Sequence, residues 1–385
     1  MTTIDAPWMR DETLVPLAKA LEGAGYLALA VGGAVRNPLM GRGASDIDLA
    51  TDALPEVVSD LAIGAGLRVI PTGIEHGTVT VLGEGEPVEV TTFRKDVETD
   101  GRHAEVAFGA DLAEDAARRD FTLNAIYADP SGVVFDPLGG IADLREGIVR
   151  FVGDADRRVQ EDYLRILRFF RFTAQFGNPE HGIEPEGLSA CATFSSEIET
   201  ISAERIGMEM LKLLAAEEPE LAVAAMQQCG ILHAILPGAD TAAFFRLSGI
   251  TDRADPIQRL AALGGEGVSK RLRLSRAQTR RLESLRKAIE AASGPGELGY
   301  RLGAEEALAV MELRAALFEA PFDRAVTKQV AVGAGATCPV AAADLSKTLH
   351  GKAIGDALRA AEAFWIASGF TLGKEEILER LPRGD

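Results

Sequence analysis

The strongest constraint on the fold is a change of pattern near residue 150. Up to that point, short apolar or alternating runs bounded by Gly or Pro alternate with helical segments, as in YLALAVGG, DIDLAT and GTVTVLG. Such runs predict β-strands. Beyond residue 150 they nearly vanish, and Ala- and Leu-rich segments with helical spacing replace them. The sequence therefore predicts an N-terminal domain of sheet and helices, followed by a long all-α region.

Composition is typical of a globular chain with a sizeable core. Hydrophobic residues make up 47% and charged residues 25% of the 385 residues, a length that predicts about two to three domains. No apolar run reaches the ~20 residues that span a bilayer, and the N-terminus lacks the pattern of a secretory signal. Cys191, Cys229 and Cys338 are too far apart in the sequence to indicate a zinc cluster or a disulfide framework, so we expect a cytoplasmic protein.

Charge is distributed unevenly along the chain. The formal net charge of −18 argues against a polyanionic partner, yet residues 269–287 carry eight Lys or Arg and a single Glu. A solvated helix face explains such a strip. A nucleic-acid contact also explains it, because counterion release depends on local contacts and not on the net charge of the protein.

One span, residues 30–52 (AVGGAVRNPLMGRGASDIDLATD), combines glycines, an arginine and two aspartates. Asp46 and Asp48 alternate along an expected strand, so both carboxylates project from one face. Two close like charges are costly unless a cation lies between them, and Mg²⁺ with oxygen ligands would satisfy both. Two solvated strand charges are the alternative.

A glycine pair precedes these aspartates. Gly32 and Gly33 follow the apolar run YLALAV and begin a short helical segment that contains Arg36. Glycines at such a place let backbone N–H groups approach a phosphate, to which a helix N-terminus adds a favourable field. A simple turn is the alternative. The order and spacing suit a nucleoside triphosphate whose phosphates bridge to a metal held by Asp46 and Asp48.

Polar side chains crowd a second segment, residues 114–129 (EDAARRDFTLNAIYAD), which we expect to be helical. Asp120 and Asn124 are four residues apart, hence on one helix face, where they can hold ribose hydroxyls. Arg119 can reach a phosphate or stack on a base. A solvated helix is the alternative, but the apolar residues around this group favour a position at the edge of a buried surface.

A third segment, residues 160–172 (QEDYLRILRFFRF), repeats polar residues every three positions. The repeating residues are Asp162, Arg165, Arg168 and Arg171. Asp162 and Arg165 form an acceptor–donor pair, and an intrahelical salt bridge worth ~0.3–0.5 kcal/mol is the alternative. Such a bridge explains one pair but not three successive arginines beside bulky apolar residues.

These motifs, in this order, resemble those of class II CCA-adding tRNA nucleotidyltransferases and bacterial poly(A) polymerases. The resemblance rests on GGAVRN, SDIDLATD, EHGTVTV, VEVTTFR, RRDFTLNA, FDPLGGIADLREGIVRFVGD and EDYLRILRFFRF, and runs from about residue 25 to 215 when ERIGMEMLKLL is included. It implies an α+β architecture, with a polymerase-β-like palm of mixed sheet and helices followed by an all-α C-terminal region. We expect the palm over residues 1–150, a helical neck over 151–215, a body over 216–295 and a tail over 296–385.

The resemblance implies a role for each matching residue. Asp46 and Asp48 would bind metal, with Glu89 as a third carboxylate. The other implied site residues contact the phosphates, ribose or base of the nucleotide: Gly32, Gly33, Arg36, Arg119, Asp120, Asn124, Asp162, Arg165, Arg168 and Arg171. In a tRNA enzyme the basic strip becomes a phosphate-contacting surface, made of Lys270, Arg271, Arg273, Arg276, Arg280 and Arg281.

The implied reaction is template-independent addition of C, C and A to the tRNA 3′ end from CTP and ATP. The 3′-hydroxyl attacks the α-phosphate, pyrophosphate leaves, and two Mg²⁺ ions activate the hydroxyl and stabilise the developing charges. Asp162 and Arg165 suit the amino group and ring nitrogen of C and A, whereas G and U place a carbonyl where Asp162 needs a donor. Residues 94–110 match a flexible loop of enzymes that add all three nucleotides, which favours full CCA addition.

Two other functions stay open. A poly(A) polymerase shares the chemistry, and a noncatalytic RNA-binding protein on a decayed palm would keep the fold.

The family usually has Asp where this chain has Asn37, and we interpret Asn37 as orienting the turn rather than binding metal. No membrane or protein partner is implied.

Overall fold

The computed structural model describes residues 2–43, 46–100, 103–346 and 349–381, with the side chains of residues 95–107 outside the description. The chain divides into two compact units, Met1–Pro237 (unit 1) and Gly238–Asp385 (unit 2). Each unit is considered by itself below.

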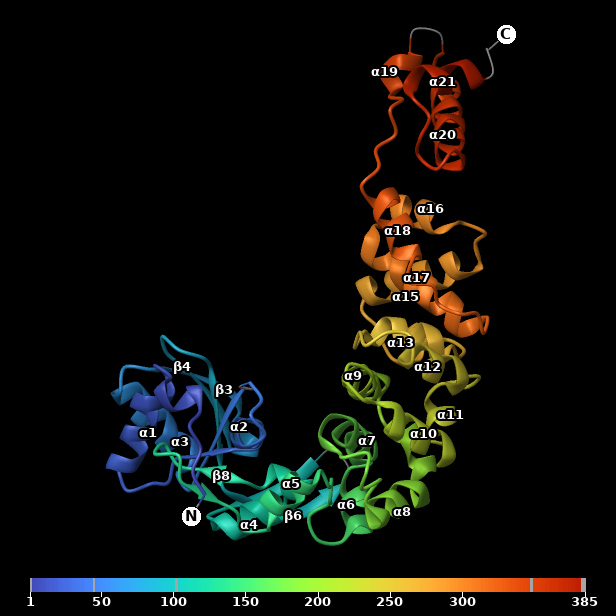
Figure 1. The fold of residues 1–385 in the computed structure, drawn as a ribbon. Coiled ribbons are helices and arrows are strands. Elements are labelled where there is room, and N and C mark those ends of the chain that lie inside the picture. Colours follow the sequence, from blue (N-terminus) through green and yellow to red (C-terminus); the bar gives the residue numbers. More distant parts are fainter. Residues whose placement is uncertain (1, 44–45, 101–102, 347–348, 382–385) are drawn as a thin grey trace. The chain divides into compact units, whose positions relative to one another are not determined.

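Unit 1 begins with a seven-stranded mixed sheet of order β3-β4-β5-β2-β1-β8-β9 (Figure 1). Its strands are β1 (Leu29–Val31), β2 (Ile47–Thr51), β3 (Arg68–Gly73), β4 (Thr78–Leu82), β5 (Val88–Thr92), β8 (Tyr127–Ala128) and β9 (Val134–Phe135). β2 and β5 run parallel, and the other strand pairs run antiparallel. Helix α3 (Pro55–Gly64) packs against β3, β4 and β5 and against α1 (Leu14–Gly23), while α2 (Gly33–Leu39) contacts β1 and β2.

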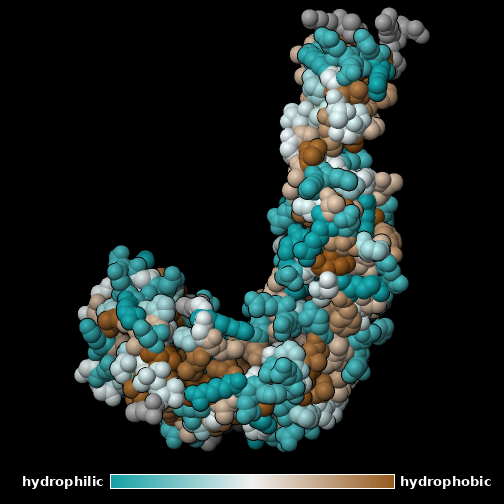
Figure 2. Space-filling view, viewed as in Figure 1, coloured by the Kyte–Doolittle hydropathy of each residue, from teal (hydrophilic) through white to brown (hydrophobic). Residues whose placement is uncertain are grey.

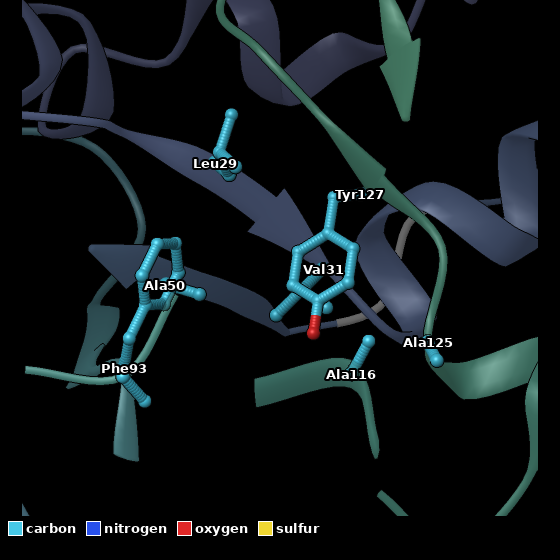
Figure 3. Close-up of a cluster of buried hydrophobic side chains, with 8 residues drawn as sticks. Leu29, Val31, Ala50, Phe93, Ala116, Ala125 and Tyr127 are labelled. Atoms are coloured by element: carbon cyan, nitrogen blue, oxygen red, sulfur yellow. The ribbon is translucent and has the colours of Figure 1, made fainter. Parts of the chain in front are cut away.

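The alternation of β2 fixes its position in the sheet. Ile47 and Leu49 are buried, whereas Asp48 between them is exposed. Successive side chains of a strand point to opposite faces, so a one-residue shift would move Asp48 into the core and both apolar residues out of it. Ala50, two residues after Asp48 and on the same face, belongs to a buried cluster with Leu29, Val31 and Tyr127 (Figure 3), so the face that carries Asp48 is apolar beyond it.

An aromatic cluster joins the sheet domain to the helices that follow it. The rings of Phe121 and Phe151 are 4.9 Å apart between centroids, and Phe121 lies 5.0 Å from Phe172. Phe151 stacks on Phe169 at 5.4 Å. Phe169 and Phe172 belong to α7 (Leu164–Phe176), so buried aromatic area fixes this helix to the sheet domain.

Residues 94–110, predicted as a loop, contain an antiparallel hairpin of β6 (Arg94–Asp100) and β7 (His103–Phe108). Residues 101–102 of the predicted loop lie outside the described residues. The link from this segment to full CCA addition stays a prediction.

The short helices η1 (Pro7–Arg10) and η2 (Ile74–His76) precede this hairpin, and the remaining helical elements of unit 1 follow it. They are α4 (Leu112–Ala117), η3 (Thr122–Asn124), α5 (Gly140–Glu146), α6 (Ala155–Glu161), α7, α8 (Pro185–Thr193), η4 (Ser195–Thr200), α9 (Ala203–Leu214), α10 (Glu220–Gln228) and α11 (Ile231–Ile235).

The helix predicted over residues 114–129 is wrong beyond its first turn. Helix α4 ends at Ala117, and Phe121 is extended and bridged to Phe151. The carboxylate of Asp120 accepts a hydrogen bond from the backbone N–H of Phe121 at 2.8 Å. Such local side-chain bonds offer the backbone an alternative to the helix.

Residues 160–172, whose three-residue repeat suggests one helical face, do not form one continuous helix. Helix α6 ends at Glu161, Asp162 is extended, and α7 starts at Leu164. The Asp162 carboxylate accepts from the backbone N–H of Leu164, the first residue of α7, at 3.1 Å, which favours the turn between the two helices over one continuous helix.

Unit 2 is helical throughout its described elements. These are α12 (Thr241–Ser248), α13 (Pro256–Leu263), α14 (Val268–Arg271), α15 (Arg276–Glu290), α16 (Pro295–Leu302), α17 (Ala304–Leu317), α18 (Val326–Ala334), α19 (Ala342–Leu345), α20 (Lys352–Ala367) and α21 (Lys374–Arg380). The predicted change from sheet and helices to helices alone is therefore confirmed in the part of the chain that is described.

Hydrophilic residues are interspersed with small apolar patches over the visible surface of both units (Figure 2). Among the described residues, every helix falls short of the length and apolar character that crossing a membrane requires.

Candidate active site

Three polar side chains form a row across the middle of the sheet. Asp48 on β2 is in register with Glu89 on β5, and Glu89 is in register with Thr80 on β4. Residues in register project from the same face of a sheet. Asp46 precedes Asp48 by two residues and lines, with all three, one cavity of about 580 Å³. The structure thus brings the carboxylates of Asp46, Asp48 and Glu89 together. We call these three acidic residues, without Thr80, the carboxylate row.

The charges of the row are crowded. Partial burial, then the neighbouring charges of Glu89 and Asp46, raise the pKa of Asp48 to about 6, while Arg119 acts in the opposite direction. Among the described residues, no group of three or more His, Cys, Asp or Glu side chains is arranged to hold a metal ion by itself. Mg²⁺ usually binds one or two carboxylates and completes its shell with substrate phosphates and water, and the row fits that pattern.

The predicted glycine turn, Gly32 and Gly33, lies beside the start of β2, where Asp48 is found. Ala30 of β1 pairs with Leu49 of β2, and this antiparallel register continued by one residue places Val31 opposite Asp48. Gly32 then caps α2 with φ of 65° and ψ of −125°, a conformation that a side chain would strain. Gly33 is the first residue of α2.

Arg36 is buried among neutral partners. Its guanidinium donates to the Oδ1 atom of Asn124 and, at 3.0 Å, to that of Asn37, and it lies 4.1 Å from the ring centroid of Phe176. Burial, followed by the charge of Arg171, lowers the pKa of Arg36 to about 10. Asn37 therefore holds an arginine, a contact compatible with its predicted orienting role. Arg36 lines a second cavity of about 600 Å³ rather than the cavity of the carboxylate row.

Asp120 and Asn124 lie side by side although no continuous helix joins them. The Nδ2 atom of Asn124 donates to Oδ1 of Asp120 at 2.9 Å. The other oxygen of Asp120 accepts from Nε and Nη2 of Arg168 at 2.8 and 2.5 Å. Burial alone would favour the neutral acid, but Arg168 and Asn124 lower the pKa of Asp120 to about 2. These three predicted site residues form one connected group.

Asp162 and Arg165 are neighbours without being partners. The Nη1 atom of Arg165 donates to Oε2 of Glu161 at 2.5 Å, and Asp162 accepts from Nη2 of Arg205 at 2.6 Å. Asp162 and Arg165 therefore do not form the salt bridge that their spacing allows, because each is paired with another residue. Each side chain is held separately, which keeps an acceptor and a donor in fixed positions at the start of α7.

Arg171, the last member of the predicted series, pairs with a residue that sequence reasoning missed. Its Nε atom lies 2.6 Å from Oε2 of the buried Glu209 on α9. Glu209 and Arg205 both belong to ERIGMEMLKLL, which contributes to the resemblance but whose spacing assigns no role to either residue. Glu161 and Asp115 were also missed as partners of predicted site residues. The motif ERIGMEMLKLL is matched to the family without being given a contact to the substrate. That mismatch is the signal that could have indicated residues that hold the predicted site residues in place.

The basic strip lies in unit 2 on α14, α15 and the turn between them. Five of the six predicted tRNA contacts are exposed: Lys270, Arg271, Arg273, Arg276 and Arg280. Arg281 differs, because it donates to Asp255 and, at 2.6 Å, to Glu306. Its charge is compensated within the unit.

Two stretches of the chain match known protein families. Residues 28–150 match the family described as "Poly A polymerase head domain", and residues 182–242 match "Probable RNA and SrmB- binding site of polymerase A".

The chain also resembles curated proteins and solved structures, among them two relatives and one crystal structure. The mitochondrial CCA tRNA nucleotidyltransferase 1 of Danio rerio is 44% identical over 202 residues, which are 52% of this chain and 47% of that protein, so the match spans about half the relative's length. The CCA-adding enzyme of Geobacillus kaustophilus is 37% identical over 327 residues, which are 80% of this chain and 79% of that enzyme. The crystal structure of the Bacillus stearothermophilus CCA-adding enzyme in complex with CTP is 29% identical, with a TM-score of 0.76 and 98% of each chain covered. The predicted fold is confirmed, and because the Geobacillus relative aligns over about four fifths of both chains, the chain belongs to the family of CCA-adding enzymes.

Proposed function

We propose that the protein adds C, C and A to the 3′ end of tRNA from CTP and ATP without a nucleic-acid template. The observation that carries the proposal is the combination, within unit 1, of the carboxylate row, the glycine turn and the polar face of α7. Family membership and the CTP-bound Bacillus stearothermophilus relative support it. We assign catalysis to residues 1–150, base recognition to 151–215 and tRNA binding to 216–295, with 296–385 as a tail.

Mg²⁺ is the cofactor that suits the carboxylate row. Asp46 and Asp48 would hold it, with Glu89 as the third carboxylate of the site. Oxygen donors on one sheet face, crowded enough to raise the pKa of Asp48 to about 6, match the preferences of a hard cation. When bound, the metal would stabilise the charge that develops on the attacked phosphate and on the leaving pyrophosphate.

The residues of the chain hold the nucleotide for in-line transfer. The oxygen of the tRNA 3′-hydroxyl forms a bond to the α-phosphorus, the bond from that phosphorus to the bridging oxygen breaks, and pyrophosphate leaves. Arg119 neutralises phosphate oxygens beside Gly32 and Gly33, whereas Arg36 holds α2 to Asn124 and lines the other cavity. The connected group of Asp120, Asn124 and Arg168 positions the ribose, and Arg171 extends this surface.

Base choice follows from hydrogen-bond direction at the start of α7. Asp162 accepts from the amino group of cytosine or adenine, and Arg165 donates to the adjacent ring nitrogen. Guanine and uracil present a carbonyl to Asp162, which leaves two acceptors facing one another. A buried mismatch of this kind costs about 1–3 kcal/mol.

A nucleotide-addition assay resolved to single nucleotides tests the proposal. The protein is incubated with tRNA transcripts that end before CCA, before CA or before A, in the presence of Mg²⁺ and each nucleoside triphosphate separately. We expect two additions from CTP, then one from ATP, and then arrest. Long A tracts on any RNA 3′ end would identify a poly(A) polymerase instead. Absence of metal-dependent pyrophosphate release would leave a noncatalytic RNA-binding protein.

Charge reversal at Lys270, Arg276 and Arg280 is expected to weaken tRNA binding about tenfold or more. It should also reduce the slope of log K against log salt by about one for each lost phosphate contact. Filter binding over a salt series measures both quantities. The control reverses Lys19, Arg68 and Arg145, exposed cations of unit 1, and so changes the net charge equally. If both triple variants bind alike, the strip is only a solvated face.

A further inference from the structure

Asp115 is a buried carboxylate that the proposed mechanism does not use. It lies on α4 with 0% of its surface exposed. Its Oδ1 atom accepts from Nε and Nη2 of Arg118 at 2.8 and 2.6 Å, and Oδ2 accepts from Nη2 of Arg119 at 3.0 Å. Burial favours the neutral acid, but the two arginines and a hydrogen bond from Tyr127 hold the pKa of Asp115 below its usual range. Asp115 is therefore a fixed anion behind Arg119.

Tyr127 completes a triangle with Asp115 and Arg119. It lies on β8, where it pairs with Val31 of β1. Its ring belongs to a buried apolar cluster, and its hydroxyl points toward Ala116 of α4 (Figure 3). The hydroxyl donates to Oδ2 of Asp115 at 2.7 Å and accepts from Nε of Arg119 at 2.9 Å.

The triangle determines how the guanidinium of Arg119 is presented. Nε and Nη2 donate to Tyr127 and Asp115, and the guanidinium carbon lies 5.1 Å from the Tyr127 ring centroid. Within the described residues, the hydrogen bonds of Arg119 use these two nitrogens and leave Nη1 for a ligand. Tyr127 is in register with Val31 of β1, and Val31 stands opposite Asp48 when the β1–β2 register is continued by one residue, so the triangle lies on the sheet face that carries the carboxylate row.

We propose that Asp115 and Tyr127 are positioning residues that orient Arg119 toward the triphosphate of the incoming nucleotide, an inference that rests on the proposed function. Two anchors on adjacent nitrogens fix both the plane and the rotation of the guanidinium. A donor held in place before the reaction stabilises transition-state charge without reorganisation. A lysine at this position would offer a point charge that cannot be held in a plane.

A purely structural network would give a different result on mutation. If the triangle only stabilised α4 against β8, loss of one hydrogen bond would lower stability equally whatever residue stood at position 119. If it orients Arg119, loss of the Tyr127 hydroxyl should matter only while a planar guanidinium is present. A double-mutant cycle between positions 127 and 119 separates these cases.

The test measures single-turnover addition of CMP to tRNA by the full-length chain, together with CTP affinity and thermal unfolding. Tyr127→Phe keeps the ring in the apolar cluster, and Asp115→Asn keeps the shape of the carboxylate. Both are expected to lower the rate constant about 10- to 100-fold, the scale on which ångström-sized misplacement acts. CTP affinity should change by less than the rate constant, because Arg119 and its charge remain.

Tyr300→Phe is the matched control, since the Tyr300 hydroxyl also donates to a carboxylate, Glu362, at 2.9 Å, but does so in unit 2. We expect it to retain the wild-type rate constant. In an Arg119→Lys background, Tyr127→Phe should change the rate constant less than twofold. Equal losses from Tyr127→Phe in the wild-type and Arg119→Lys backgrounds, or a Tyr127→Phe rate like that of Tyr300→Phe, would overturn the inference while leaving the proposed function intact. A wild-type protein that adds no nucleotide would refute both.

Discussion

Replacement of Asp48 by asparagine is expected to abolish nucleotide transfer, with a loss of at least about 10³-fold. Removal of one preorganised group that stabilises transition-state charge costs about 10²- to 10³-fold, and Asp48 is in addition a proposed metal ligand. It occupies the centre of the carboxylate row, in register with Glu89 and two residues from Asp46. Asparagine keeps the shape of the side chain but lacks the charge that a cation requires. Single-turnover incorporation of labelled CTP into tRNA measures the effect.

The same substitution should leave the fold and RNA binding intact. Asp48 is crowded by Glu89 and Asp46, so a neutral side chain removes repulsion from the metal-free protein. We expect the thermal unfolding midpoint at neutral pH to be unchanged or higher, and tRNA affinity to persist because the basic strip is untouched. Glu86→Gln is the control, since Glu86 lines the same cavity but precedes β5. Retained turnover in Asp48→Asn would contradict the metal assignment.

The sequence was most informative where local periodicity and burial coincide. The alternation in IDLAT predicts which face of β2 carries Asp48, because the apolar residues beside it must be buried. The turn at Gly32 could be predicted in the same way, since a glycine directly after a buried strand indicates a backbone conformation that is strained for residues with a side chain. Both features depend on a few consecutive residues and not on the rest of the fold.

The partners of the predicted site residues could not be read in this way. Arg165 lies near Asp162 and Glu161 in the sequence, and the structure gives it Glu161 because Asp162 is held by Arg205, 43 positions away. Arg171 is held by Glu209 on another helix. Which acidic residue pairs with which arginine depends on how the helices pack against one another. Residue spacing within one helix therefore identifies the polar face but not these ion pairs.

In two segments, helical spacing does not correspond to one continuous helix, for a related reason. At Asp162, a carboxylate accepts the backbone N–H of Leu164 where the chain turns from α6 into α7. At Asp120, three residues after α4 ends, a carboxylate accepts the backbone N–H of Phe121, where the backbone is extended. Both aspartates belong to the proposed nucleotide site, where an irregular backbone brings side chains from different elements together. Helical spacing placed Asp120 beside Asn124 correctly, although a turn rather than a continuous helix joins them.

Replacement of Arg165 by alanine is expected to reduce the preference for CTP over UTP by about 100-fold or more. Sites built to hydrogen-bond a substrate reject a mismatched analogue by about 10⁴- to 10⁵-fold, so loss of one of two reading groups should remove a large share of this discrimination. Arg165 is the group at risk because, within the described part of the chain, its side-chain hydrogen bonds to Glu161 and to the backbone carbonyl of Arg158 both use Nη1 and leave Nε and Nη2 for a base. Asp120 and Arg168 cannot replace it, since they are already bound to one another.

The measurement is kcat/KM for CTP, ATP, UTP and GTP on tRNA that lacks the terminal nucleotides, with tRNA affinity determined in parallel. Arg157→Ala is the matched control, because Arg157 lies 3.6 Å from the same Glu161 but its side chain is 82% exposed on α6. The control should keep both rate and selectivity. An Arg165→Ala variant with unchanged selectivity would place base recognition outside α7, whereas one with lost selectivity and normal tRNA affinity would locate it at the start of this helix.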